Sequence, residues 1–296
     1  MSKETNTLTV KEMCELAGVS RSGYYNWIRR EPVRQNRELQ DKADFALILD
    51  AYNYRGYAKG ARSIHMRLLH KGIRMNLKKI RRLMKKYELL CPIRKANPYR
   101  RMAKALRTNA VADNRVNREF RQHGPRKILL TDITYIPFDG KFCYLSVIKD
   151  AFTQQVLSHV LSESLEVDFV LETVNRLIEK HYWSLDTEVM IHSDQGCHYT
   201  SIKFRELLRN HQICQSMSRR GNCWDNAPQE SFFGHMKDEL SEKKSNWSTI
   251  EQVSADIDDW IDYYNNDRCQ WDLDKLTPNE FYDYTITGIN PLSMNG

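Results

Sequence analysis

The sequence of 296 residues has no apolar run that approaches the ~20 residues a membrane-spanning helix needs. Its first ten residues also lack the pattern of a signal peptide. We therefore expect a cytoplasmic protein with no membrane partner. The seven cysteines are odd in number and form no Cys-x-x-Cys pair, which favours reduced thiols. A histidine-cysteine metal module is disfavoured, because His65, His70 and Cys91 have no second cysteine nearby.

Positive charge is concentrated in one part of the chain. The whole sequence carries +7, and residues 71–107 contain fourteen Lys or Arg against one acid, Glu88. This block alone carries +13, so the remaining residues together carry −6. A basic block beside an acidic remainder indicates phosphate binding by one module, in a chain long enough for about two domains. The alternative is a solvated basic linker.

Residues 1–31 have the pattern of a helix-turn-helix. Thr9 and Glu12 form a capping box, Gly18 suits a left-handed turn, and Ser20 caps a second helix. Tyr24, Trp27 and Ile28 are available for packing. The polar residues near the start of the second helix would face a DNA major groove, and they are Arg21, Ser22, Tyr25 and Asn26. A plain helical hairpin is the alternative.

Residues 43–90 predict a second, strongly basic helix-turn-helix. We expect residues 31–42 to be a linker, followed by a helix over 61–70 and another over 77–87 capped by Asn76. The cations that surround the apolar stripe of the last helix are candidate DNA contacts: Lys78, Lys79, Arg81, Arg82, Lys85 and Lys86. Residues 91–122 are then a basic linker, which either follows a DNA backbone or serves as a tether.

The periodicity changes at Arg126, where the pattern of an α/β domain begins. Strands are expected over 127–136, 141–150, 155–161, 188–193 and 213–218, with Asp139-Gly140 as a hairpin turn. Helices are expected over 167–181 and 201–211, and from Glu230 onward. The order indicates a mixed five-stranded sheet flanked by helices over 123–245. The helical extension, 246–296, has an aromatic stripe over 247–264 for core packing or, alternatively, a protomer contact.

Three acids stand out in this domain. Asp132 lies in the middle of an apolar strand, where an ionised carboxylate needs a cation or several hydrogen bonds. A structural aspartate bonded to a turn is the alternative. Asp194 ends a strand and Glu230 begins a helix, so the three acids can converge on one sheet edge and hold Mg²⁺. Two such ions, with Mn²⁺ as a substitute, suit an in-line phosphoryl substitution.

Several separated motifs carry a resemblance to a known family. They are GVSRSGYYNW, GARSIHMRLLHKGIRMNLKKIRRLMKK, LLTDITYIPF, GKFCYLSVIKDAF, IHSDQGCHYTS, SMSRRGNCWDNAPQESFFGHMKDEL and YYNNDRCQWDLDKLTP. In this order they resemble the second-reading-frame transposase of the large IS-three family of bacterial insertion sequences. The 35 residues between Asp194 and Glu230 match the DD(35)E pattern of that family and of retroviral integrases.

The resemblance implies a ribonuclease H-like fold with Asp132, Asp194 and Glu230 as catalytic metal ligands. It implies binding of the terminal inverted repeats, cleavage to a free 3′-hydroxyl, and attack of that hydroxyl on target DNA, usually through a circular intermediate. Lys237, two helical turns after Glu230, would touch the transposon end near the scissile phosphate; a solvated surface lysine is the alternative.

Further expectations from the family concern partners and place. Double-stranded DNA, both transposon end and target, is the expected partner, with a homo-oligomer forming on it near the bacterial nucleoid. The chain has no leucine-zipper heptads, which relatives obtain by frameshift fusion with an upstream-frame product. Two other functions share these features: a ribonuclease H-like nuclease without strand transfer, and a non-catalytic DNA-binding regulator.

Overall fold

A five-stranded mixed sheet forms the centre of the catalytic half of the chain. The structure, a computed structural model, describes residues 8–89, 91, 123–218 and 227–293. The strand order is β3-β2-β1-β4-β5. The strands are β1 (Ile128–Phe138), β2 (Lys141–Asp150), β3 (Val156–Ser162), β4 (Met190–Ser193) and β5 (Cys214–Met217). The first three are antiparallel neighbours, whereas β4 runs parallel to both β1 and β5.

The long β1–β2 hairpin closes at Asp139-Gly140, as predicted. Both turn residues have positive φ, 43° at Asp139 and 68° at Gly140. Two successive positive φ values match the right-handed twist of the flanking strands, and this is why Asp-Gly is favoured there. The tight turn fixes the register of the hairpin, in which Asp132 lies opposite Val147.

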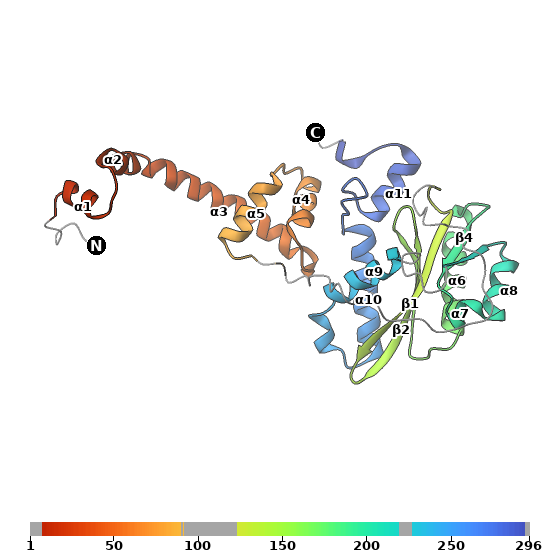
Figure 1. Ribbon diagram of the computed structural model, residues 1–296. Coiled ribbons are helices and arrows are strands. Elements are labelled where there is room, and N and C mark those ends of the chain that lie inside the picture. Colours follow the sequence, from red (N-terminus) through yellow and green to blue (C-terminus); the bar gives the residue numbers. More distant parts are fainter. Residues whose placement is uncertain (1–7, 90, 92–122, 219–226, 294–296) are drawn as a thin grey trace.

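Helices cover both faces of the sheet (Figure 1). On one face, α6 (Asp168–His181), α7 (Cys197–Thr200) and α8 (Ile202–Asn210) pack against a cluster that includes Leu129, Ile148 and Ile191. On the other face, α9 (Ala227–Glu239) and α10 (Ile250–Asn266) share a cluster with residues such as Ile136 and Leu145. The predicted mixed five-stranded sheet, flanked by helices and preceded by all-helical modules, is confirmed.

The C-terminal helices complete the fold. Helix α10 buries Val253, Ile257 and Trp260 in the cluster beneath α9, so its packing against its own domain is confirmed. The helix begins at Ile250, three residues later than the stripe suggested. Helix α11 (Pro278–Thr287) was not predicted, although Thr277 and Glu280 form a capping box at its start. Short 3-10 helices lie at Tyr54–Gly56 (η2), Tyr182–Ser184 (η4), Lys243–Asn246 (η6) and Pro291–Ser293 (η7).

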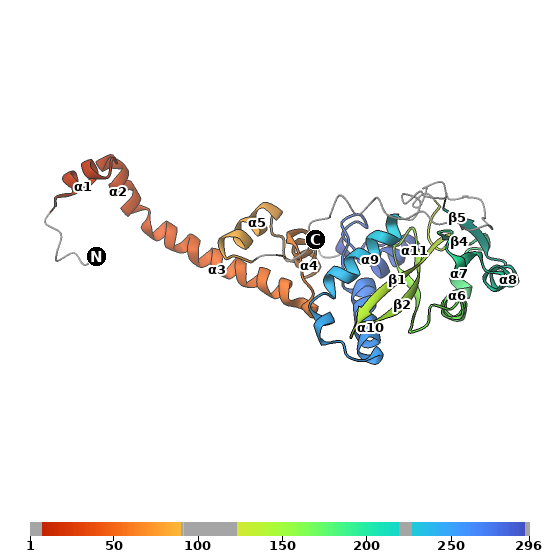
Figure 2. The same ribbon diagram turned by 60° about the horizontal axis from the view of Figure 1, so that its bottom comes forward.

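One helix replaces the linker expected at residues 31–42. Helix α3 runs without interruption over Glu31–Asn53, and it carries α1 (Val10–Leu16) and α2 (Arg21–Arg29) away from the sheet (Figures 1 and 2). The sequence of α3 lacks a complete apolar stripe, because two acids, Asp41 and Asp44, occupy positions that face the core. They are buried only because cations of a later helix pair with them.

The three helices α3, α4 (Ala61–His70) and α5 (Leu77–Lys86) form a compact basic module. Ile48, Ile64, Leu68 and Ile80 meet in its core. The Asn76 side chain caps α5 by accepting a hydrogen bond from the Lys78 backbone N–H at 2.8 Å, as predicted. The helix pair expected over residues 61–87 is therefore present, with α3 as its third member.

This basic module is fixed to the catalytic half by the segment after α3. The Tyr54 hydroxyl donates to Asp267 Oδ1 at 2.6 Å, and Arg55 pairs with Asp262 at 2.7 Å. The ring of Tyr57 stacks on that of Tyr263 within the α9/α10 cluster, with centroids 4.4 Å apart. A buried contact of this kind holds the second module in a defined position relative to the sheet.

The first two helices have almost no core of their own. The capping box of Thr9 and Glu12 and the Ser20 cap are present, as predicted. However, Trp27 is 59% exposed and Ile28 39% exposed, so the expectation that these two residues pack inside the hairpin is wrong. Across the described ranges, no helix combines the length and the apolar character needed to cross a membrane.

Candidate active site

Asp132 and Asp194 occupy equivalent levels of neighbouring parallel strands. The last paired residues of β1 and β4 are Leu130 and His192, and each aspartate follows two positions later. Side chains along β1 point alternately to the two faces of the sheet, so Asp132, Ile136 and Phe138 point to the same face. Ile136 and Phe138 belong to the α9/α10 cluster. Asp132 therefore belongs to the sheet face that α9 covers. Its Oδ1 accepts a hydrogen bond from the backbone N–H of Ile133 at 2.8 Å.

The loop after β4 is built to hold the Asp194 carboxylate. Asp194 Oδ1 accepts a hydrogen bond from the Gly196 N–H at 2.8 Å. A Cβ at position 196 would lie 2.8 Å from the same oxygen, so only glycine permits this approach. Gln195 donates to the Ser218 carbonyl at 3.0 Å, and His192 contacts Ser216 at 2.9 Å across to β5. These contacts shape the loop that carries Asp194.

Glu230 lies in the first turn of α9, as predicted. Its side chain keeps exposed surface, but partial burial raises its pKa, and the negative charge of Asp194 raises it further. The preceding residue, Gln229, is fully buried and donates to the Val147 carbonyl at 3.5 Å. Because Val147 lies opposite Asp132 in the hairpin, the start of α9 is tied to the strand pair that carries Asp132.

A buried tyrosine links the two aspartates electrostatically. Tyr199 of α7 is almost fully buried, and its hydroxyl lies 3.5 Å from Thr131 Oγ1. Burial raises the pKa of Tyr199 well above its ordinary value, and the charges of Asp132 and Asp194 raise it further. The phenol therefore stays neutral beside both acids. Sequence reasoning missed this residue, since a tyrosine in a short helix gives no signal of its own.

A buried lysine was also missed. Lys149 of β2 is 1% exposed, and its ammonium donates to Gln154 Oε1 at 3.0 Å and to the Pro228 carbonyl at 3.2 Å. The ammonium also lies 5.1 Å from the ring centroid of Phe232. Lys149 thus anchors the first turn of α9, two residues before Glu230. Its sequence signal is the same as that of Asp132, a charged residue inside an apolar strand.

The carboxylate donors suit Mg²⁺ chemically, since this ion prefers oxygen ligands. Their arrangement is different from the expected one. No three His, Cys, Asp or Glu side chains in the described ranges form a group that could hold a metal ion as they stand. The expectation that the three carboxylates lie close enough to share ions is therefore not met in this conformation. Residues 219–226, which lead into α9, lie outside the described residues.

The residues expected to contact DNA fall into two groups. On α5, Lys79 pairs with Asp44, Arg82 with Asp41, and Lys86 with Glu38 and Asp41. These three cations are thus engaged by α3, which sequence periodicity did not reveal. The candidates that remain exposed on α5 and α2, without an ion pair to any described residue, are Lys78, Arg81, Lys85 and Arg21; Ser22, Tyr25 and Asn26 are exposed as well. Lys237 lies half-buried in the last turn of α9.

Family models and relatives agree with this architecture. Residues 122–223 and 230–286 each match a model described as an integrase core domain, and residues 38–97 match an HTH-like domain. The chain is 30% identical over 271 residues to the insertion element IS600 uncharacterized 31 kDa protein of Shigella sonnei, covering 91% of this chain and 97% of that one. It is 26% identical over 285 residues to transposase InsF for insertion sequence IS3A of Escherichia coli, covering 95% and 96%.

Among solved structures, the chain is similar to the HTLV-2 integrase catalytic core domain in complex with magnesium. The TM-score is 0.43 at 17% identity, over 55% of this chain and 99% of that one.

The class of protein is therefore an integrase-core enzyme with an attached HTH-like domain. Within that class, the chain belongs to the IS-three family of insertion-sequence transposases. An integrase core implies polynucleotidyl transfer, which agrees with the acids at the sheet edge.

Proposed function

We propose that this transposase binds the terminal inverted repeats of its own element, cleaves their 3′ ends and joins them to target DNA. The main support is that Asp132 and Asp194 follow neighbouring strands of the sheet, with Glu230 in the first turn of the adjacent helix α9. Asp132 and Asp194 follow the last paired residues of adjacent strands by the same two positions. Glu230 is close enough to Asp194 for the two charges to interact.

In this proposal Asp132, Asp194 and Glu230 hold Mg²⁺, as two ions, with Mn²⁺ able to substitute. Bound there, the metal would activate the attacking oxygen and stabilise the leaving oxygen of an in-line displacement. To hold the ions, the three carboxylates have to come closer together than they are in this structure. Glu230 lies on helix α9, whereas Asp132 and Asp194 lie on or directly after strands of the sheet. Neutralising the repulsion between Glu230 and Asp194 favours that closure.

The chain's own residues orient the reacting groups. The Gly196 N–H fixes one oxygen of Asp194, which leaves the other free to turn toward a ligand. Lys149 and Gln229 fix the start of α9 against β2. Because α9 is continuous from Glu230 to Lys237, seven residues apart, both side chains project from the same face. We assign Lys237 to the transposon end near the scissile phosphate on this basis.

We further propose a division of labour along the chain. The helices up to residue 31 and the basic module over 43–90 bind DNA, residues 91–122 link them to the core over 123–245, and 246–296 support that core. On α5, the exposed Lys78, Arg81 and Lys85 are free to meet phosphates. Double-stranded DNA is the partner in both the end and target roles. Homo-oligomer assembly on DNA and fusion with an upstream-frame product belong to the same proposal.

A strand-transfer assay tests the proposed reaction. A labelled terminal duplex, a target plasmid and Mg²⁺ are incubated with the full chain. Asp132→Asn, Asp194→Asn and Glu230→Gln should each reduce both the nicked and the joined products at least a thousandfold, because metal binding needs the carboxylates. Asp168→Asn is the matched control, since Asp168 is an exposed acid at the start of α6 that pairs with the exposed Lys203.

Each alternative function has its own outcome in that assay. Cleavage without any joined product would identify a nuclease of the same fold. Metal-independent binding of the ends, with neither product, would identify a DNA-binding regulator. If the triple substitution left joining intact, the assignment of these acids would be wrong.

A further inference from the structure

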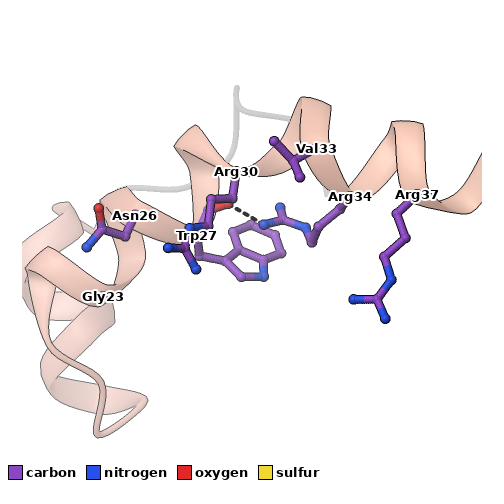
Figure 3. A pocket seen from close by; sticks show the side chains of 7 residues that line it. All are labelled: Gly23, Asn26, Trp27, Arg30, Val33, Arg34 and Arg37. Carbon is purple, nitrogen blue, oxygen red and sulfur yellow. Dashed lines mark hydrogen bonds between the residues drawn. The ribbon is translucent and has the colours of Figure 1, made fainter.

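A basic groove lies at the corner between α2 and α3, outside the catalytic half (Figure 3). It has a volume of about 460 Å³. One wall comes from α2 and the other from the first turns of α3, and the lining residues are Gly23, Asn26, Trp27, Arg30, Val33, Arg34 and Arg37. None of these residues is an acid.

Arg34 bridges the junction between α2 and α3. Helix α2 ends and α3 begins around a single residue, Arg30, so the two helices are separated by a one-residue break. The Arg34 guanidinium donates a hydrogen bond to the Trp27 carbonyl and lies 4.1 Å from the centroid of the Trp27 ring. This contact spans the corner and keeps the indole at the surface, where it is 59% exposed. The two walls of the groove are therefore joined by a specific side-chain contact.

The groove concentrates positive charge on one face. Arg30, Arg34 and Arg37 are spaced by four and three residues, which places them on one side of α3. Neither Arg30 nor Arg37 has an ion pair to any residue in the described ranges. The acids of α3 closest to them interact with other residues: Glu31 accepts a hydrogen bond from Gln35, and Glu38 forms an ion pair with Lys86.

We propose that this groove binds the sugar-phosphate backbone of duplex DNA, next to the bases that α2 is expected to read. The proposal rests on the proposed function and adds a second kind of contact to it. Guanidinium groups match phosphate oxygens in geometry and charge, while Trp27 and Val33 offer apolar surface to the sugar. Asn26 belongs both to the groove and to the polar face of α2, so one duplex can meet both.

A polyanion is favoured over a second copy of the chain. Three arginines without an acid in the lining would repel the same surface on another protomer. Contacts to the backbone position a protein on DNA but carry no sequence information. The groove should therefore strengthen binding to every duplex alike.

Salt dependence of DNA binding tests this assignment in the full chain. The double variant Arg30→Gln/Arg37→Gln is compared with Arg30→Lys/Arg37→Lys, which keeps the charge, and with Lys42→Gln, an exposed cation of α3 outside the groove. Fluorescence anisotropy is recorded with a labelled terminal duplex and an unrelated duplex. Each neutralised phosphate contributes about 0.9 to the slope of log K against log salt, so the Gln variant should lose about 2 in slope on both duplexes. The Lys variant and Lys42→Gln should keep the wild-type slope.

Several results would overturn the proposal. An unchanged slope in the Gln variant shows that the arginines do not meet phosphates. A loss confined to the terminal duplex shows that they read bases instead. Unchanged DNA binding with a lower mass in sedimentation shows that the groove holds a second protomer. Wild-type protein that binds both duplexes equally would count against the proposed recognition of the ends, while the slope comparison would still decide the groove.

Discussion

Replacing the buried Lys149 by methionine should destabilise the protein and weaken its reaction. The ammonium makes two described hydrogen bonds, to Gln154 Oε1 and to the Pro228 carbonyl, and lies over the ring of Phe232. Methionine fills a similar volume but leaves both oxygens without this donor. The change therefore tests whether a charge in the sheet holds the start of α9.

The magnitude follows from opposing effects. Hydrogen bonds to a charged group contribute about 1.5–3 kcal/mol each, and an acceptor left unsatisfied on burial costs about 1–3 kcal/mol. Against this, methionine removes the cost of burying an ammonium, which offsets part of the loss. We expect a net loss of about 2–4 kcal/mol in the free energy of unfolding. DNA cleavage should fall further than DNA binding, because Pro228 lies just before Glu230.

The assay is urea unfolding followed by tryptophan fluorescence, with end binding and cleavage measured under native conditions. Lys149→Arg should recover part of the cleavage, since it keeps a donor and a charge. The control is Lys127→Met, whose lysine is 46% exposed and pairs with Asp186, so it should change stability by about 0–1 kcal/mol. If Lys149→Met were as stable as this control and cleaved ends normally, the anchoring role would be refuted.

Two further substitutions examine the acids directly. Gly196→Ala should lower single-turnover cleavage at least tenfold with end binding unchanged, because the new Cβ would meet Asp194 Oδ1 at 2.8 Å; Gly234→Ala, with no atom within 4 Å, should behave as wild type. Glu230 has a raised pKa, so the folded state holds its proton more tightly, and stability from this group is lost as pH rises through that pKa. Glu230→Gln should therefore be more stable than wild type at pH 7 in metal-free urea unfolding, and the gain should vanish below about pH 4, where the carboxyl group is protonated in both states. A gain that persisted in acid would contradict this explanation.

The catalytic half was accessible from the sequence because its signals are local. Asp139-Gly140 needs two positive φ values, and strands on both sides of it alternate or run apolar. The position of Asp132 in an apolar strand indicated that a cation or several hydrogen bonds must stabilise its carboxylate. The resemblance then identified Glu230 rather than Asp225 as the third acid, a choice that the local sequence leaves open.

The N-terminal half was harder to predict. The sequence of helix α3 resembles a linker because its buried positions hold Asp41 and Asp44, whose partners lie about forty residues away on α5. The same pairs remove three of the six cations of α5 from the set of free DNA contacts. Local patterns cannot show which charges meet across a fold.

By itself, the sequence determined the succession of strands and helices along the chain, the hairpin turn, the helix caps and the three candidate acids. These depend on neighbours within a few residues, where backbone geometry and side-chain periodicity decide the outcome. Tertiary structure decided how the parts act together: Lys149 beneath the start of α9, Tyr199 beside two aspartates, and Trp27 exposed in a basic groove. In each case the energy comes from burial and charge between residues far apart in the chain, and only the folded arrangement brings them together.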